Sequence, residues 1–131
     1  VCMDQEGIDA VKNVMNHPFV ALCPQSNIFI HNSLPPVPLM RRNGLKITVG
    51  TDSLSSNDDL DVVAELRCLQ NAFPEVGLNE LLTWACRNGA EFLSKENEYG
   101  SIAVGKRPGL VAIENLPDGR LTPESRSHRI I

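Results

Sequence analysis

An aspartate that follows an expected strand is the residue of this chain best placed to do chemistry. Residues 45–50 alternate apolar and polar side chains, as in a strand with two unlike faces, and Thr51 and Asp52 follow directly. In folds that alternate strands with helices, catalytic groups come from the carboxyl ends of the strands. A carboxylate there can bind a metal ion or carry a proton, so Asp52 is the first candidate for both roles.

The other residue types that could do chemistry lack partners at a useful spacing. The three histidines and four cysteines form no ligand cluster and no C-x-x-C pair, which argues against a zinc knuckle. His31 is therefore expected on the surface. Ser55 and Ser56 have neither a Gly-x-Ser-x-Gly elbow nor a histidine partner, so we expect them to cap the next helix.

Composition and charge indicate one globular unit. The 131 residues are 42% hydrophobic without a bilayer-spanning run, and the formal charge of −4 with a pI of about 5.3 argues against nucleic acid or an anionic membrane as a partner. Three of the four cysteines lie in apolar contexts and are expected to be buried free thiols. No signal peptide is visible, so a cytoplasmic location is expected, and the start at Val1 suggests a cropped or processed product.

The first part of the chain predicts two strands with helices around them. A helix is expected over residues 4–14, with an apolar stripe from Ile8 to Met15. The apolar run 19–23 predicts a strand buried on both faces, as in a parallel sheet. A short helix at 38–43 leads into the strand at 45–50, and the separation of the two strands suits a right-handed parallel crossover.

The second part predicts two helices and then short strands. Helices are expected over residues 59–72 and 78–86, the second one followed closely by Gly89. The residues expected to face inward from the first of them are Leu60, Val63, Leu66 and Leu69. Residues 99–106 and 110–113 look like short strands between glycine and proline turns, and residues 116–129 predict an edge hairpin or a loose end.

Four short motifs, taken in order, resemble the C-terminal third of the metal-dependent amidohydrolase superfamily. They are C-P-Q-S-N at 23–27, G-T-D at 50–52, W-A-C-R-N-G-A at 84–90 and G-S-I-A-V-G-K at 100–106. The chain is most similar to the aminohydrolase and chlorohydrolase branch, which includes guanine and S-adenosylhomocysteine deaminases. The resemblance covers roughly residues 5–113. The chain departs from the family pattern at two places. The family has threonine at the position of Cys86, and it has alanine and aspartate after the lysine turn, where this chain has Arg107-Pro108-Gly109.

The resemblance implies a metal site of which this chain holds one ligand. The family's cage takes histidines from earlier strands and an aspartate from the last strand, which corresponds to Asp52. It implies zinc or iron and a small-molecule substrate for a full-length enzyme, with Asp52 as metal ligand and proton carrier. Ser26 and Asn27 resemble residues at the rim of the substrate pocket; hydrogen bonding to their own loop backbone is the alternative. No cofactor is expected in the isolated chain, because one carboxylate does not hold a metal against water.

We therefore predict an α/β chain that is the C-terminal fragment of a (β/α)₈ barrel: its last two strands with the following helices, over residues 1–98, and a short β-rich segment with the tail over residues 99–131. The predicted function is a fragment of a metal-dependent aminohydrolase for an amino-substituted nitrogen heterocycle, inactive as the isolated chain. The alternative is a non-catalytic module that associates with itself or completes a partner. Unpaired edges on the two strands predict a homo-oligomer, without nucleic acid or a membrane as partner.

Overall fold

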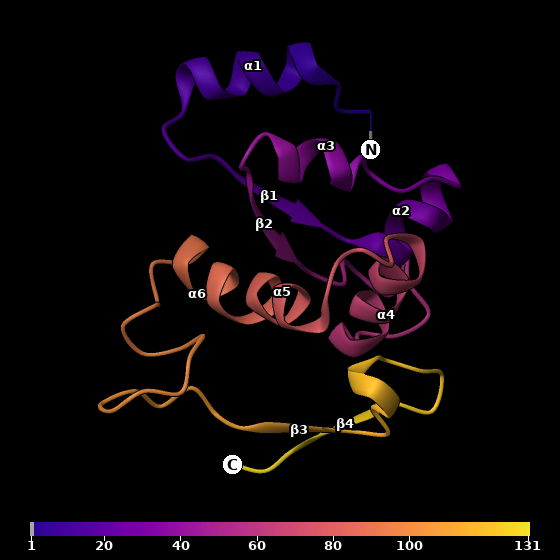
Figure 1. The fold of residues 1–131 in the computed structure, drawn as a ribbon, viewed down its shortest axis with the longest axis vertical. Coiled ribbons are helices and arrows are strands. Elements are labelled where there is room, and N and C mark those ends of the chain that lie inside the picture. The colour runs from indigo at the N-terminus through magenta and orange to yellow at the C-terminus, as the bar shows by residue number, and fades with distance from the viewer. Residues whose placement is uncertain (1) are drawn as a thin grey trace.

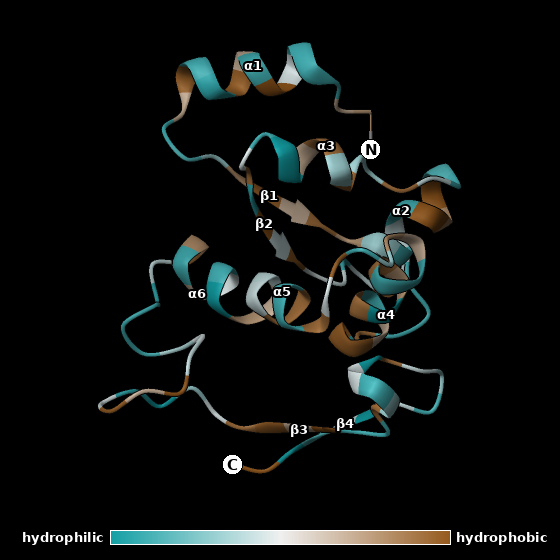
Figure 2. Cartoon of the chain, in the orientation of Figure 1, coloured by the Kyte–Doolittle hydropathy of each residue, from teal (hydrophilic) through white to brown (hydrophobic). Residues whose placement is uncertain are grey.

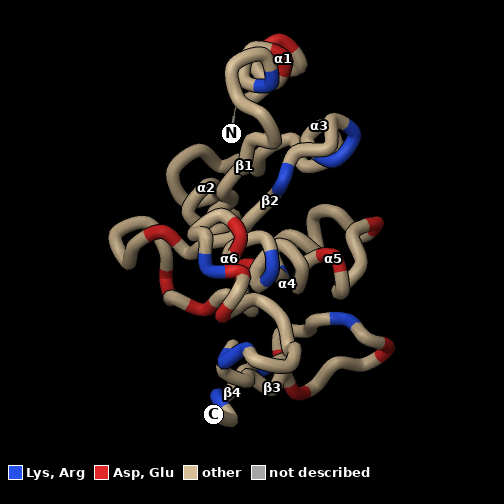
Figure 3. Tube along the Cα trace, turned by 90° about the vertical axis from the view of Figure 1, so that its left-hand side faces the viewer, with Lys and Arg blue, Asp and Glu red and all other residues tan. Residues whose placement is uncertain are grey.

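A computed structural model describes residues 2–131 as a stack of layers along one long axis (Figure 1). In Figures 1 and 3, which view the chain from directions 90° apart, α1 lies at one end and β3 with β4 at the other, with the first sheet between them. The elements before the middle of the chain are α1 (Gln5–Val14), β1 (Phe19–Leu22), α2 (Pro24–His31), α3 (Val37–Arg42) and β2 (Lys46–Val49). Those that follow are α4 (Val62–Ala72), α5 (Leu78–Leu82), η1 (Thr83–Asn88), α6 (Gly89–Phe92), β3 (Val111–Glu114), η2 (Pro117–Gly119) and β4 (Arg126–Arg129).

The expected first helix forms and is capped by its own sequence. The Asp4 side chain accepts a hydrogen bond from the Gly7 backbone N–H at 2.8 Å, which satisfies one of the free donors of the first turn. Ile8 is fully buried, but Val14 is 82% exposed and Met15 54% exposed. The predicted apolar stripe is therefore covered at one end only.

Strands β1 and β2 pair in parallel, as the sequence predicts. Phe19 is opposite Lys46 and Leu22 is opposite Val49, and the chain crosses between the strands through α2 and α3. Each strand is shorter than expected. β1 was expected to be buried on both faces, but Ala21 is exposed, so this prediction is wrong for the face on which Ala21 lies. The sequence also missed α2, which begins directly at Pro24, where the fixed proline backbone suits a first helical position.

One outer backbone group of β2 has a side-chain partner. The N–H groups of Lys46 and Gly50 donate to the β1 side, at Pro18 and Leu22, so the alternating residue Ile47 faces the other edge. The Ile47 carbonyl accepts a hydrogen bond of 2.7 Å from the Asn88 side chain of η1. The outer edge of β2, which was predicted to be unpaired, therefore has a hydrogen-bond donor at Ile47.

Helix α4 begins later than predicted and leaves one expected core residue outside. Its N-cap is Asp61, whose side chain accepts a 2.8 Å hydrogen bond from the Val63 N–H, instead of residues near Asp59. Leu60 precedes the helix and is 53% exposed, which corrects its inward placement, whereas the other three predicted residues are buried. Ser55 and Ser56, expected as caps, lie in the turn before the helix.

The second predicted helix is longer than its pattern suggests. α5, η1 and α6 follow one another without a break, and the backbone at Gly89 is helical, so the helix does not end there. η1 is a π-helical turn, a feature that often lies near functional sites. Trp84, within it, is buried in the core beside Leu81.

The C-terminal part forms an antiparallel hairpin and a glycine-rich turn. β3 pairs with β4, with Val111 opposite Arg129, which confirms, shifted by one residue, the strand predicted at 110–113. Residues 116–129 do not form a hairpin of their own, because their strand β4 pairs back with β3. The strand predicted at 99–106 is wrong. There the chain bends at Gly100, where φ is +80°, and turns again so that the Lys106 N–H bonds the Ala103 carbonyl.

The remaining expectations concern cysteines, charge and membrane spans. All four cysteines are free, but Cys2 and Cys86 are exposed and the other two are half-buried, so the predicted burial is wrong. Figure 3 shows basic and acidic residues interspersed along the trace. No helix among residues 2–131 is long and apolar enough to cross a membrane.

Candidate functional site

Asp52 lies three residues beyond the carboxyl end of β2, with its side chain exposed. Its φ of 59° is in the left-handed region, which an aspartate adopts at some energetic cost and only where its surroundings enforce it. One carboxylate oxygen, Oδ2, accepts a hydrogen bond of 3.0 Å from the Ser26 hydroxyl. The first turn of α2, directly after β1, therefore holds the carboxylate that follows β2.

Ser26, predicted as a pocket residue, lies in the first turn of α2 and is 1% exposed. Its hydroxyl oxygen is 3.0 Å from Asp52 Oδ2 and 2.9 Å from the Ser56 hydroxyl. Since a hydroxyl has one proton, Ser26 donates to one of these at a time, and the carboxylate is the stronger acceptor. The geometry makes Ser26 a support for Asp52.

Asn27, the other predicted pocket residue, is half-buried on the same helix. Its backbone N–H donates to the Cys23 carbonyl at 2.8 Å, which is the first hydrogen bond of α2. His31, at the last turn of α2, is exposed, in agreement with the surface position expected for it.

A second carboxylate, which the sequence analysis did not single out, lies beneath this pair. Glu65 of α4 is completely buried and accepts hydrogen bonds from the Gln25 backbone N–H at 2.9 Å, the Gln25 side-chain amide at 3.2 Å and the Asn57 side-chain amide at 2.5 Å. The same Asn57 amide donates to the Thr51 carbonyl at 2.8 Å. A readable signal existed, because Glu65 is four residues before Leu69 and so shares its inward helix face.

Cys23 stands between β1 and α2, as the N-cap residue of α2, and its thiol is near the backbone of Gly50 and Asp52. Burial raises the pKa of the Cys23 thiol above its ordinary value, and the negative charge of Asp52 and, less strongly, that of Glu65 raise it further. Hydrogen bonds from the backbone of Asp52 and of Gly50 act in the opposite direction. The Cys23 side chain is therefore a neutral thiol at physiological pH, packed among the two carboxylates.

The donor set of these residues does not fit a metal ion. No three His, Cys, Asp or Glu side chains within residues 2–131 come together in a way that could hold one. A catalytic zinc site ordinarily takes three protein ligands and keeps one position open, whereas no such group of ligands surrounds Asp52 among residues 2–131. A metal at Asp52 would need further ligands from outside this part of the chain.

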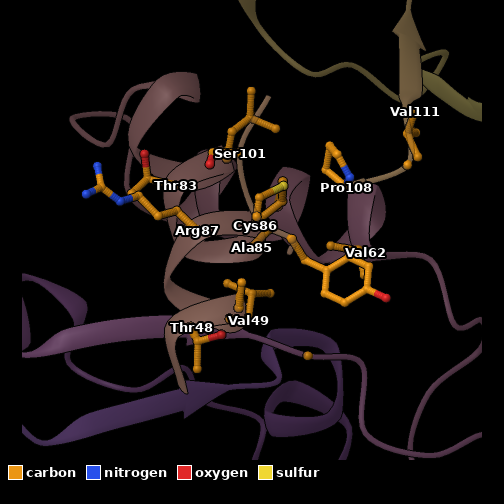
Figure 4. A pocket seen from close by; sticks show the side chains of 18 of the residues that line it. Thr48, Val49, Val62, Thr83, Ala85, Cys86, Arg87, Ser101, Pro108 and Val111 are labelled. Atoms are coloured by element: carbon orange, nitrogen blue, oxygen red, sulfur yellow. The ribbon is translucent and has the colours of Figure 1, made fainter. Parts of the chain in front are cut away.

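A cavity of about 1310 Å³ is separate from Asp52. It lies between β2, α4, η1 and the turn after Gly100, and apolar residues make up most of its wall. Figure 4 shows Cys86 of η1 between Ser101 and Pro108 in this space, with Thr48 and Val49 on the opposite side. Because neither Asp52 nor Ser26 lines it, the cavity is not the site of the predicted chemistry.

Comparison with known proteins identifies related chains. The model of the amidohydrolase family matches residues 1–127. The chain is 34% identical over 102 residues to a 5-methylthioadenosine/S-adenosylhomocysteine deaminase of Moorella thermoacetica and 31% identical over 133 residues to a 5′-deoxyadenosine deaminase of Methanobrevibacter smithii. These matches cover 72% and 95% of this chain but 24% and 30% of the two relatives. The chain thus spans less than a third of their length.

Two solved structures have a similar fold over part of their length. An adenosine deaminase from Xanthomonas campestris, solved with bound zinc, matches 86% of this chain and 27% of its own with a TM-score of 0.73 and 28% identity. An E. coli guanine deaminase matches 87% of this chain and 27% of its own with a TM-score of 0.73 and 19% identity, which shows likeness of fold alone.

Proposed function

Because this chain belongs to the amidohydrolase family, we propose that it supplies part of the active site of a hydrolytic deaminase that acts on an adenosine-like ring bearing an amino group. The observation that carries the proposal is the position of Asp52: exposed, at the carboxyl end of a parallel strand, in a left-handed conformation and held by Ser26. Relatives that act on adenosine derivatives, according to their names, supply the substrate class.

In this reaction water adds to the ring carbon that bears the amino group, and ammonia leaves. A carboxylate near both can accept a proton from the water and pass it to the amino nitrogen, so that the C–N bond breaks with release of neutral ammonia and not of an amide ion. We assign both transfers to Asp52. Since Ser26 binds Oδ2, we assign the moving proton to Oδ1.

The whole site is larger than this chain. The family's metal would take Asp52 as one ligand only if the rest of the parent site is supplied. The Xanthomonas campestris adenosine deaminase, solved with bound zinc, is an example of a relative that holds such a metal. We therefore propose that the chain corresponds to the last two strands of a (β/α)₈ barrel with their helices, and that the isolated chain has no deaminase turnover. Asn27 stays a predicted substrate contact. Ser26 stays one as well, on the condition that α2 moves.

A segment exchange tests this proposal. The matched segment of the Methanobrevibacter smithii relative, which covers 95% of this chain, is replaced by the corresponding residues of this chain to give the exchange chimera. We expect the chimera to convert 5′-deoxyadenosine to the 6-oxo product with release of ammonia, and the isolated chain to release none. Turnover by the isolated chain would overturn the proposed inactivity, and a folded but inactive chimera would overturn the assigned function.

One observation favours a second candidate, a module that associates with itself or with a partner chain. Apolar side chains are exposed on α2 and at the end of α1, among them Phe29 at 69% and Val14 at 82%. Figure 2 shows hydrophobic residues in brown on both helices. Surfaces of this kind are often covered by another chain. An inactive chimera together with a stable assembly of the isolated chain would support this candidate over the first.

A further inference from the structure

We infer that Glu65 is the positioning residue of Asp52: a buried carboxylate that locks the first turn of α2 to the loop after β2 and so sets the Ser26–Asp52 contact. The inference rests on the proposed function, because Asp52 is the group whose position it explains. Its observations are independent of that function, since they concern the contacts of Glu65 with α2 and with the loop after β2.

The partners of Glu65 stand immediately before the two residues of the pair. Gln25, which donates to Glu65 through its backbone and its side chain, precedes Ser26. Asn57 bridges Glu65 to the carbonyl of Thr51, which precedes Asp52. One buried side chain on α4 therefore holds the backbone on both sides of the 3.0 Å contact between Ser26 and Asp52.

The burial of Glu65 indicates that its contacts are strong. An ionised carboxylate with no exposed surface is costly unless several donors satisfy it, and Glu65 has three, all from neutral groups. Within residues 2–131 it makes no ion pair. The arrangement suits a clamp that acts through neutral hydrogen-bond donors.

The conformation of Asp52 explains why a clamp is needed. Its positive φ is unfavourable for a residue with a side chain and persists where neighbouring contacts determine it. The carbonyl of Thr51 is bound by Asn57 just before this residue. Release of that carbonyl allows the backbone to return to an ordinary region and moves the carboxylate away from Ser26.

The test compares two isosteric substitutions in α4. Each is made in the exchange chimera and in the 131-residue chain. Glu65→Gln replaces one carboxylate oxygen, which accepts hydrogen bonds, by an amide NH₂ group, which donates them. This donor then faces the donating amide of Asn57 or Gln25. Gln70→Glu is the matched control, because Gln70 is also buried in α4 but bonds the backbone of Leu121, away from α2 and from the loop after β2. Asn57→Ala is a second variant that frees the Thr51 carbonyl and leaves α4 intact.

We expect Glu65→Gln and Asn57→Ala to lower kcat of the chimera by about 10–100-fold with little change in KM, as is typical of lost supports around a reacting group. Gln70→Glu is expected to lower the Tm and leave kcat within about threefold. In the complete chain, hydrogen–deuterium exchange over residues 50–57 should rise in the first two variants and stay unchanged in the control.

The two measurements separate the inference from the proposed function. If the chimera is inactive while hydrogen–deuterium exchange over residues 50–57 rises in the variants, the proposed function is wrong and the inference about Glu65 is supported. If Glu65→Gln fails to fold, Asn57→Ala alone decides. The assignment of Glu65 is overturned if hydrogen–deuterium exchange over residues 50–57 is unchanged in Glu65→Gln and Asn57→Ala. It is also overturned if these variants lose no more kcat than Gln70→Glu does.

Discussion

At the scale of single residues, the proposed chemistry depends on a carboxylate whose surroundings are defined by hydrogen bonds. Ser26 binds one oxygen of Asp52, and Glu65 holds the chain on either side of the contact. Asp52→Asn keeps the shape of the side chain but removes its ability to carry a proton at neutral pH. We expect the exchange chimera to lose at least about 10³-fold in kcat, near the upper part of the range of positioned acid–base catalysis.

Steady-state kinetics with a circular-dichroism melting curve measures this loss. Asp58→Asn is the matched control, because Asp58 is an exposed carboxylate in the same loop. If the Asp52→Asn chimera keeps more than a tenth of the rate, the proton-carrying role is wrong.

A second prediction at this scale concerns the thiol of Cys23. Its raised pKa leaves a smaller thiolate fraction at a given pH, so alkylation by iodoacetamide should need a higher pH than for an ordinary cysteine. Asp52→Asn removes one of the negative charges that raise this pKa, so the alkylation profile of Cys23 should move to lower pH. Mass spectrometry of the alkylated chain gives the profile.

Cys68 is an internal control for this shift. Burial and the charge of Glu65 raise the pKa of its thiol, and Asp52 is not among the causes. Its profile should therefore not change with Asp52→Asn. A Cys23 profile that stays in place or moves to higher pH would show that the Asp52 charge does not reach the thiol.

At the scale of elements, the turn at Gly100 fixes how the C-terminal part leaves the helices. A Cβ built there would lie 2.6 Å from the Ala90 Cβ and 2.9 Å from the Cys86 carbonyl, and φ is +80°. Gly100→Ala should cost about 1–2 kcal/mol for the left-handed backbone and about 1–3 kcal/mol more for overpacking against groups that do not yield. Urea denaturation of the complete chain measures the change.

The matched control for Gly100→Ala is Gly119→Ala. Gly119 has a φ of +70° but nothing within 4 Å of its added Cβ, so it should show the backbone cost alone. Equal losses in the two variants would mean that the helix and the turn separate readily, and the close approach at Gly100 would carry no stability.

At the scale of the whole molecule, we expect the isolated chain to associate. The outer edge of β1 and the apolar side chains of α1 and α2 favour pairing with a second chain, although Asn88 already caps the Ile47 carbonyl on the edge of β2. Light scattering over a dilution series should show a dimer or a larger assembly. A cooperative monomer whose mass does not depend on concentration in the low micromolar range would contradict this expectation.

The sequence by itself determined the features that depend on neighbours along the chain. The alternation at 45–50 and the run at 19–23 predicted two parallel strands, and Asp4 predicted the start of α1, because period and caps are local properties. Asp52 was found in the same way, from its place after a strand. The four ordered motifs predicted the family, which the match over residues 1–127 confirms. The strand predicted at 99–106 failed because its glycines serve bends and a close approach, which a local pattern does not distinguish from strand ends.

Only the tertiary structure decided how the site is held together. Gln25 and Glu65 are forty residues apart, and Ser26 and Asp52 twenty-six, so their hydrogen bonds leave no periodic trace in the sequence. Folding brings the first turn of α2 beside the loop after β2 because β1 and β2 are neighbours in one parallel sheet and end at the same edge. A buried carboxylate in that place becomes a clamp through its three donors, two of which come from Gln25 of α2 and one from Asn57 in the loop after β2.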